Sequence, residues 1–456
     1  MPHRGQSGWR RRNAPGGRLV KIAVIGGAGV RVPLLAGGLS RSDMKLSEIA
    51  LYDIDQDRLR IIANLASQMA DGVKITTTAT PEPAIDGSSF VITSIRVGGA
   101  ERRAQDEAVA LAHDVVGQET IGPAGFAMAV RSIPPIVDYG RMVSRLAPRA
   151  WMINFTNPVS IITQAVHQET DARLIGICDT PLEMFEDAAH ALGLPASVCG
   201  YDYFGLNHLG WLRDVLFEGQ GQLHRIWTDD ARLMSAYRAP LFEPERLREL
   251  KLLPTEYLYY YYRPAHALAQ IKASGSSRGQ FVARLTEELF QALNHSTPQA
   301  RKPASPQAPI ALYQRYLSAR DSSYMQLETG SAPRIKPDWA ELSGYDKIAL
   351  VTIRAIVKNQ GAIIPLDVPN RGTFPFLEDD DIIEVPCRVD ASGPRPNAVG
   401  PIPDHPRDLI TTVKHYERAT IRAALTGDRR QLADALALNP LVPSKDLAER
   451  LVAAML

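Results

Sequence analysis

Cys178 and His208 are the two side chains whose types best suit metal-dependent chemistry. Cys178 follows an apolar run at 175–177, and His208 follows the segment 205–207, Gly-Leu-Asn. Each position predicts a polar residue at the tip of a strand that ends in a cleft. Because a thiolate and an imidazole can share one divalent cation, the pair predicts a metal site. The alternative is that both are buried structural residues, which is common for a free cysteine.

A glycine-rich turn near the N-terminus predicts a dinucleotide site. The apolar run 19–25 is followed by Gly26, Gly27 and Gly29, and Val30 comes next. Glycines let backbone amides approach a pyrophosphate at the start of a helix. Asp53 follows the strand predicted at 49–52, where its carboxylate can bind the two ribose hydroxyls and repel a 2′-phosphate. We therefore predict NAD rather than NADP. Val32 departs from the usual last glycine, and a tight turn without a ligand is the alternative.

The elements that must position these residues alternate between strand and helix in the first 200 residues. Apolar runs predict strands at 19–25, 49–52, 73–78, 90–95, 151–154 and 174–177, and helical periodicity predicts helices at 56–69, at 131–146 and after Pro158. This alternation predicts an α/β fold with a doubly wound parallel sheet. Later segments predict strands within 201–217, helices at 258–272 and 279–293, a surface loop at 296–309 and a mainly helical stretch at 404–456.

We accordingly predict three parts of the chain. Residues 1–18, with five arginines and no apolar core, form a disordered basic tail rather than a secretory signal. Residues 19–200 form a Rossmann-like NAD-binding domain of the lactate and malate dehydrogenase kind. Residues 201–456 form an α+β, mainly helical domain for substrate, metal and oligomerisation.

Bulk composition excludes several other classes of protein. The 456 residues carry a net charge of +1, which gives no field that would favour nucleic acid or membrane surfaces. No apolar run approaches the ~20 residues that span a bilayer. Three scattered cysteines do not make a disulfide framework, so a reducing cytoplasm fits best. A small-molecule partner is therefore expected.

Polar segments after the later predicted strands, together with Cys178 and His208, carry a family resemblance. They are the segments 96–103, 116–125 (Val-Gly-Gln-Glu-Thr-Ile-Gly-Pro-Ala-Gly), 154–158 (Asn-Phe-Thr-Asn-Pro), 178–181 (Cys-Asp-Thr-Pro), 205–208 (Gly-Leu-Asn-His) and 253–258 (Leu-Pro-Thr-Glu-Tyr-Leu). In this order they resemble the family 4 glycoside hydrolases, which depend on NAD and a divalent metal. The resemblance runs from Lys21 to about Leu438 and is nearest the 6-phospho-β-glucosidase branch.

The resemblance implies a role for each matching residue. Cys178 and His208 would hold Mn²⁺ or a similar ion. Tyr257 would be the catalytic base, and Glu119 would raise its basicity. Three residues would contact the sugar or its phosphate: Arg103, Asn157 and Arg278. Asp179 matches the proton donor of the α-glycosidase members, whereas many β-specific members have Asn there. Asp179 could instead orient the metal site.

The resemblance also implies a redox route to glycoside hydrolysis, which is an exception to the usual two-carboxylate mechanism. NAD⁺ would take a hydride from C3 of the sugar, and the metal would polarise the resulting ketone. Tyr257 would then remove the C2 proton, the aglycone would leave C1, and water addition and hydride return would complete the cycle. A phenol with a pKa near ~10 is a poor base at pH 7, so Tyr257 must lie close to the cation.

Several alternatives stay open at this stage. An α-glycosidase or a glycosidase of non-phosphorylated sugars would share these motifs. A malate- or lactate-type dehydrogenase would share the NAD domain, but such enzymes use His, Asp and Arg rather than a Cys–His metal pair. A non-catalytic NAD sensor would not need Cys178, His208 and Tyr257. Family relatives assemble as homodimers or homotetramers, and the sequence does not choose between them.

Overall fold

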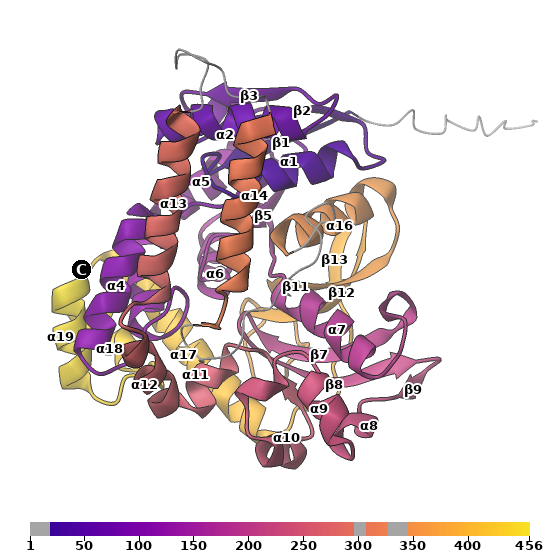
Figure 1. Cartoon of the computed structure of the whole chain (residues 1–456), viewed down its shortest axis with the longest axis vertical. Helices are drawn as coiled ribbons and strands as arrows, with labels where there is room; N and C mark the ends of the chain where they lie inside the picture. The colour runs from indigo at the N-terminus through magenta and orange to yellow at the C-terminus, as the bar shows by residue number, and fades with distance from the viewer. Residues whose placement is uncertain (1–18, 296–306, 327–343) are drawn as a thin grey trace, which may run out of the picture.

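The computed structural model describes residues 19–295, 307–326 and 344–456. The predicted basic tail at 1–18 lies outside the described residues, as does most of the loop predicted at 296–309. In Figure 1 the N-terminal strands lie at the top, and the strands and short helices that follow residue 200 lie at the lower right. None of the helices formed by the described residues is both long and apolar enough to cross a membrane.

The first half of the chain forms a parallel sheet. Its strands are β1 (Val20–Ile25), β2 (Leu46–Tyr52), β3 (Ile75–Thr78), β4 (Phe90–Thr93), β5 (Trp151–Asn154) and β6 (Arg173–Gly176). They are arranged in the order β3-β2-β1-β4-β5-β6, with parallel pairing throughout. This is the order of a doubly wound dinucleotide-binding fold, in which ligands bind beyond the carboxyl ends of the strands. The predicted fold class is confirmed.

Helices connect these strands, as expected for parallel pairs. They are α1 (Val32–Ser40), α2 (Gln56–Met69), α3 (Pro81–Ile85), α4 (Gly99–Ala112), α5 (Gly122–Leu146), α6 (Val159–Glu169) and α7 (Thr180–Ala191). Asp55 caps α2 by accepting a hydrogen bond from the Arg58 amide. The predicted helix at 131–146 was too short, because α5 begins at Gly122. The turn-forming residues there belong to the helix: a side chain at Gly125 would lie 2.4 Å from the Thr120 backbone, so only glycine allows this close approach.

The second half of the chain extends the same sheet with antiparallel strands. These are β7 (Gly200–Leu206), β8 (Leu209–Phe217), β9 (Gln220–Gly221), β10 (Leu253–Pro254), β11 (Ala362–Pro369), β12 (Ile382–Asp390) and β13 (Gly393–Pro396). Asp367 of β11 pairs with Gly176 of β6, and Glu384 of β12 pairs with Gly205 of β7. Buried residues of both halves belong to one continuous hydrophobic core. The strands β6 and β7 therefore belong to one sheet, and the loops that follow them carry Cys178 and His208.

Helices of the second half cover this sheet and the cofactor half. They are α8 (His224–Trp227), α9 (Asp230–Ser235), α10 (Pro244–Leu250), α11 (Leu258–Tyr262), α12 (Pro264–Ser274), α13 (Arg278–His295), α14 (Gln307–Ser322), α16 (Tyr345–Lys358), α17 (Asp404–Thr426), α18 (Arg429–Leu436) and α19 (Lys445–Met455). The helix predicted at 258–272 divides into α11 and α12, because Pro264 cannot continue α11 and restricts Arg263.

Helices α13 and α14 stand side by side in front of the N-terminal half (Figure 1). A second, smaller apolar cluster joins them to α2. Its buried members are Leu65, Leu289, Leu293, Tyr313, Tyr316 and Leu317, with Val30 packed against them. Helix α14 therefore ties the second half of the chain to the predicted cofactor turn.

Candidate active site

The glycine turn after β1 has the backbone geometry that a phosphate cradle requires. Gly26 has a φ of +93°, and a side chain there would lie 2.1 Å from the Ser94 carbonyl oxygen. At Gly27 a side chain would lie 2.9 Å from Leu51 Cβ, and the Gly29 amide donates to the Gly26 carbonyl at 3.0 Å. Only glycine fits at Gly26, because both the backbone conformation and the space exclude a Cβ.

Asp53 and Val30 lie at this turn, as predicted from the sequence. One oxygen of Asp53 accepts a hydrogen bond from the Ala28 amide at 3.0 Å, and the other accepts one from the Asp55 amide at 3.0 Å. The carboxylate is thus held against the turn. The Val30 carbonyl accepts a hydrogen bond from the Tyr313 hydroxyl of α14 at 2.6 Å. Backbone groups and one carboxylate form this site. A dinucleotide requires both, for its pyrophosphate and its ribose hydroxyls.

Cys178 lies two residues beyond the end of β6 and is 1% exposed. Burial raises the pKa of its thiol well above the ordinary value, and the nearby Glu384 carboxylate adds to the shift. The thiol therefore holds its proton unless a cation takes the proton's place. This environment suits a metal ligand better than a free nucleophile.

His208 occupies the two-residue turn between β7 and β8, with a φ of +62°. Burial lowers its pKa to about 3, so the ring is neutral at pH 7. The Thr120 hydroxyl lies 2.8 Å from Nδ1 and 3.3 Å from Gln118 Oε1. Because the Gln118 oxygen can only accept, Thr120 donates to it and accepts from Nδ1–H. That arrangement leaves the Nε2 lone pair available to a metal.

Tyr257 follows β10 and begins the turn into α11. Its ring stacks on the ring of His208, with centroids 3.7 Å apart and an angle of 12° between the planes. Burial raises the pKa of the Tyr257 phenol well above its ordinary value, and Glu256 adds to the shift. A nearby cation would act in the opposite direction. The structure therefore places Tyr257 beside His208, where the predicted base has to be.

Glu119 lies in an arginine cluster, and its charge also acts on Tyr257. Arg103 Nη1 lies 2.6 Å from the Glu119 carboxylate, and Arg96 pairs with the other oxygen. Burial alone would raise the pKa of Glu119, but these arginines outweigh it and hold the pKa at about 2. Arg103 also donates through Nε to Glu107 at 2.8 Å. Two of its nitrogens are thus paired with carboxylates, and its predicted contact with the sugar would have to use the rest of the guanidinium.

Asn157 and Arg278 were both predicted to contact substrate. Asn157 Oδ1 is buried and has no hydrogen-bond partner among the described residues, as expected for an acceptor that awaits a ligand. Arg278 is the first residue of α13. Its guanidinium donates to the Ser323 hydroxyl and, at 2.7 Å, to the Arg320 carbonyl. Arg278 therefore fixes the end of α14.

Asp179 stands beside Cys178 at the start of α7. A side chain added at Gly344 would lie 2.8 Å from its carboxylate, so Asp179 faces Gly344, directly before α16. The charge of Asp179 adds to the high pKa of Cys178, behind the larger contributions of burial and Glu384. These contacts fit either of the two roles considered for Asp179.

A buried pair of acids behind Cys178 was not foreseen as a functional feature. Asp367 and Glu384 are register partners on β11 and β12 and are 0% and 1% exposed. Burial raises the pKa of Asp367 well above its usual range and that of Glu384 to about 7. Glu384 accepts hydrogen bonds from Tyr203 at 2.5 Å and from Asn207 at 3.3 Å. Because Asn207 precedes His208, Glu384 helps to shape the His208 turn.

Cys178 and His208 would supply only part of a metal coordination sphere. Across 19–295, 307–326 and 344–456, no three Cys, His, Asp or Glu side chains gather in a way that could hold a metal ion. Catalytic sites keep positions open for substrate and water. A thiolate and a neutral imidazole fit a divalent transition metal of this kind. A small cavity lies beside His208, and its lining includes Thr120, Asn207 and Pro158.

Two family models match the chain over most of its length. The model described as family 4 glycosyl hydrolase matches residues 21–194, and that of the family 4 glycosyl hydrolase C-terminal domain matches residues 203–442. The chain belongs to glycosyl hydrolase family 4. This confirms the predicted family and the predicted enzyme class, a glycoside hydrolase.

Named relatives of this family 4 enzyme act on phosphorylated glucosides. The 6-phospho-β-glucosidase of Escherichia coli is 30% identical, over 96% of this chain and 94% of its own. A phospho-α-glucosidase of Clostridium acetobutylicum is 25% identical, over 94% of this chain and 96% of its own.

Solved structures support the predicted cofactors. The 6-phospho-β-glucosidase of Thermotoga maritima, solved with NAD and glucose-6-phosphate, is 26% identical, covers 96% of this chain and 97% of its own, and has a TM-score of 0.81. A further structure of that enzyme contains manganese as well. A malate dehydrogenase with 10% identity and a TM-score of 0.52 shares the fold alone, as predicted for the cofactor half.

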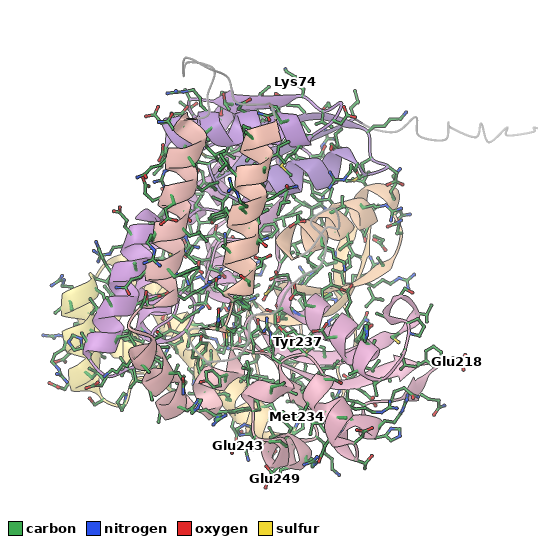
Figure 2. The ribbon with its side chains drawn as sticks, viewed as in Figure 1. Lys74, Glu218, Met234, Tyr237, Glu243 and Glu249 are labelled. Atoms are coloured by element: carbon green, nitrogen blue, oxygen red, sulfur yellow. The ribbon has the colours of Figure 1, made fainter. Side chains whose placement is uncertain are left out.

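Several residues that were not predicted from the sequence form hydrogen bonds next to the predicted site residues. Glu256, 1% exposed, accepts hydrogen bonds from Thr180 at 3.0 Å, Tyr237 at 2.5 Å and Tyr324 at 2.9 Å. Tyr237 is 8% exposed and is labelled near the middle of the view in Figure 2, whereas Glu218 and Glu249 lie at its edges. Glu256 could have been predicted from the sequence, because it directly precedes Tyr257. No sequence pattern indicates Tyr324, because only the fold brings it next to Glu256.

Proposed function

We propose that this enzyme hydrolyses the O-glycosidic bond of a 6-phospho-glycoside, with the β-linked substrate favoured. The observation that carries the proposal is the stacking of Tyr257 on His208 at 3.7 Å, beside the buried Cys178. A general base, an imidazole and a thiol in one buried cluster suit removal of a proton from carbon next to a polarised oxygen. The phosphate of the substrate is inferred from the named relatives.

The residues of this chain would have three functions: binding NAD, binding the metal ion and transferring the C2 proton. The turn from Gly26 to Val30 and the Asp53 carboxylate would hold NAD, while Cys178 and His208 would hold Mn²⁺ or a similar ion. When bound, these groups would supply hydride acceptance at C3 and polarisation of the sugar oxygens. Tyr257 would take the C2 proton, exchange it with solvent and later deliver a proton to C2.

The other predicted residues would bind and orient the sugar. Asn157 offers its unpartnered Oδ1 as an acceptor for a sugar hydroxyl. Arg103 would hold Glu119 in place, and the negative charge of Glu119 would make Tyr257 more basic, as predicted. Arg278 would act near the phosphate or through the end of α14. Asp179 would either protonate the leaving group or orient the metal site.

The match of Asp179 to the α-type proton donor leaves the anomer open, and two relatives point in different directions. The E. coli relative acts on a β-glucoside and is 30% identical, whereas the phospho-α-glucosidase is 25% identical. We therefore favour the β-linked substrate and keep the α-linked one as the second candidate, because Asp179 matches the α-type proton donor.

We also propose a cytoplasmic enzyme that forms a homodimer or homotetramer. Free Cys178 and the use of NAD suit a reducing compartment that supplies this cofactor. Leu425 and Leu438 are exposed apolar side chains near the ends of α17 and α18, in the part of the chain assigned to oligomerisation. Light scattering of the purified protein would give its mass in solution.

A panel of α- and β-aryl glycosides, each with and without a 6-phosphate, tests the proposed function. The assay contains NAD⁺ and Mn²⁺ under reducing conditions. We expect release of the aryl group from the 6-phospho-β-glycoside, with no net formation of NADH. Net NADH from a 2-hydroxy acid, without cleavage of any glycoside, would contradict the proposal and favour the dehydrogenase alternative.

A further inference from the structure

Tyr324 is the hydrogen-bond neighbour of the proposed base. Its hydroxyl lies 3.0 Å from the Tyr257 hydroxyl and 2.9 Å from Glu256 Oε1. The three residues thus form a continuous chain from the buried carboxylate, through Tyr324, to the oxygen that would take the C2 proton. Tyr324 lies 67 residues after Tyr257, in the turn that follows α14.

The chemistry of these three groups limits the directions of their hydrogen bonds to two arrangements. A tyrosine hydroxyl donates one hydrogen bond and accepts others, whereas a carboxylate only accepts. Tyr324 can donate to Glu256 while it accepts from Tyr257, or it can turn its one proton toward Tyr257. In both arrangements the Tyr257 oxygen stays beside Tyr324, so the direction of its remaining lone pair is set.

The rest of the surroundings holds Tyr324 in one place. Arg278 donates to the side chain of Ser323 and to the carbonyl of Arg320, which fixes the last turn of α14. The guanidinium of Arg238 lies 5.3 Å from the centre of the Tyr324 ring. Such a fixed donor costs little entropy when it orients a reacting group.

Glu256 is fixed from its other side as well. Thr180 donates to the oxygen that Tyr324 contacts, and Tyr237 donates to the second oxygen. A carboxylate with several fixed donors keeps its place in a buried site. The carboxylate in turn anchors the hydroxyl of Tyr324.

We propose that Tyr324, anchored by Glu256, is a positioning residue that aims the Tyr257 oxygen at the substrate carbon that loses its proton. The inference rests on the proposed function, in which Tyr257 is the base. It adds a residue that does not touch the substrate. It also gives α14 a second role, because the same helix bonds the cofactor turn through Tyr313.

The test compares the wild type with Tyr324→Phe, which removes the hydroxyl and keeps the ring. The matched control is Tyr316→Phe, which removes the hydroxyl of a buried tyrosine in the preceding helix α14, where it contacts Thr286 and Arg320. Rates are measured on a 6-phospho-β-aryl glucoside with NAD⁺ and Mn²⁺. Separate substrates carry deuterium at C2 or at C3, and thermal unfolding checks that each variant is folded.

We expect Tyr324→Phe to lower kcat about 10- to 100-fold, the range for a lost hydrogen bond to a charged group, with KM changed less than about twofold. The isotope effect for C2 should rise and that for C3 should fall, because proton removal becomes slower relative to hydride transfer. Tyr316→Phe should match the wild type. A structural role would instead change both isotope effects little.

Two outcomes separate failure of this inference from failure of the proposed function. If the wild type cleaves the glycoside but Tyr324→Phe keeps the wild-type kcat and C2 isotope effect, the positioning role is wrong. If the wild type cleaves no glycoside, the proposed function is wrong. Glu256→Gln gives a second check: it keeps an acceptor oxygen for Tyr324, so its kcat should lie between those of the wild type and Tyr324→Phe.

Discussion

The cofactor turn and the Cys178–His208–Tyr257 cluster are built in opposite ways. The turn comes from one contiguous βαβ unit, and its shape is set by backbone: Gly26 has a φ of +93° and no space for a Cβ. The cluster comes from loops after β6, β7 and β10, and its shape is set by side chains such as Thr120, which lies 2.8 Å from His208. Local geometry makes the first site, whereas long-range packing makes the second.

This difference predicts how the two sites respond to mutation. A change in the cluster should remove chemistry while NAD binding survives, because no cluster residue shapes the glycine turn. A change in the turn should weaken NAD binding and folding together, because the turn belongs to the sheet itself. Substitutions at each site test whether chemistry and NAD binding are lost separately.

The largest effect is expected for Cys178→Ala. Loss of the thiolate should remove the metal and lower kcat at least about 1000-fold, since a Lewis acid contributes several kcal/mol. Calorimetric titration should show no Mn²⁺ binding, while NAD binding stays at the wild-type level. Cys199→Ser is the control, because Cys199 lies outside the cluster. Full activity of Cys178→Ala in metal-free buffer would show that Cys178 holds no metal.

Tyr257→Phe should lower kcat about 100- to 1000-fold, within the range for loss of a general base. Its KM should change little, because the ring and its stacking on His208 remain. Initial rates with an activated aryl 6-phospho-glucoside measure the effect. Tyr259→Phe is the matched control, since that neighbouring hydroxyl contacts His266, 2.8 Å away. Equal rates for both variants would exclude Tyr257 as the base.

Gly26→Ala should reduce the free energy of unfolding by about 3 kcal/mol, from the left-handed backbone and from overlap with the Ser94 carbonyl. NAD binding should weaken with it. Gly72→Ala is the control, because Gly72 has a φ of +69° but no atom within 4 Å of an added Cβ. It should cost only about 1 kcal/mol. Urea unfolding and fluorescence titration with NAD give the two quantities, and similar losses in both variants would contradict the packing argument.

The smallest effect is expected for Thr120→Val, which keeps the shape of Thr120 but removes the hydroxyl that bonds His208. Affinity for Mn²⁺ should fall about 10-fold, the lower end for loss of a bond to a metal-ligating histidine. Thr120→Ser should restore most of it. Calorimetric titration measures both variants, and unchanged affinity in Thr120→Val would show that this hydroxyl does not orient the ring.

The fold and the cofactor turn could be predicted from the sequence because their signals are local. Apolar runs marked the six parallel strands, and glycines followed by Asp53 marked the turn. Prolines and glycines misled where packing overrides local preference: α5 begins at Gly122, nine residues before the predicted start at 131. Only the antiparallel extension through β11 and β12 shows that one sheet joins both halves.

The cluster was predicted in part, and its supporting residues were not. Cys178, His208 and Tyr257 could be found because their motifs resemble a known family. Tyr324 and Thr120 act through contacts that depend on how distant segments pack, and no spacing in the chain reveals such contacts. That Arg96 and Arg103 are the partners of Glu119 was likewise visible only in three dimensions.

The fate of deuterium at C2 of a 6-phospho-β-glucoside tests the central claim most directly. In ordinary water with NAD⁺ and Mn²⁺, the wild type should release glucose-6-phosphate that has lost its C2 label to solvent, as followed by NMR. Tyr257→Phe should show neither product release nor exchange at a comparable rate. Glucose-6-phosphate that keeps its C2 deuterium after hydrolysis by the wild type would contradict proton removal by Tyr257.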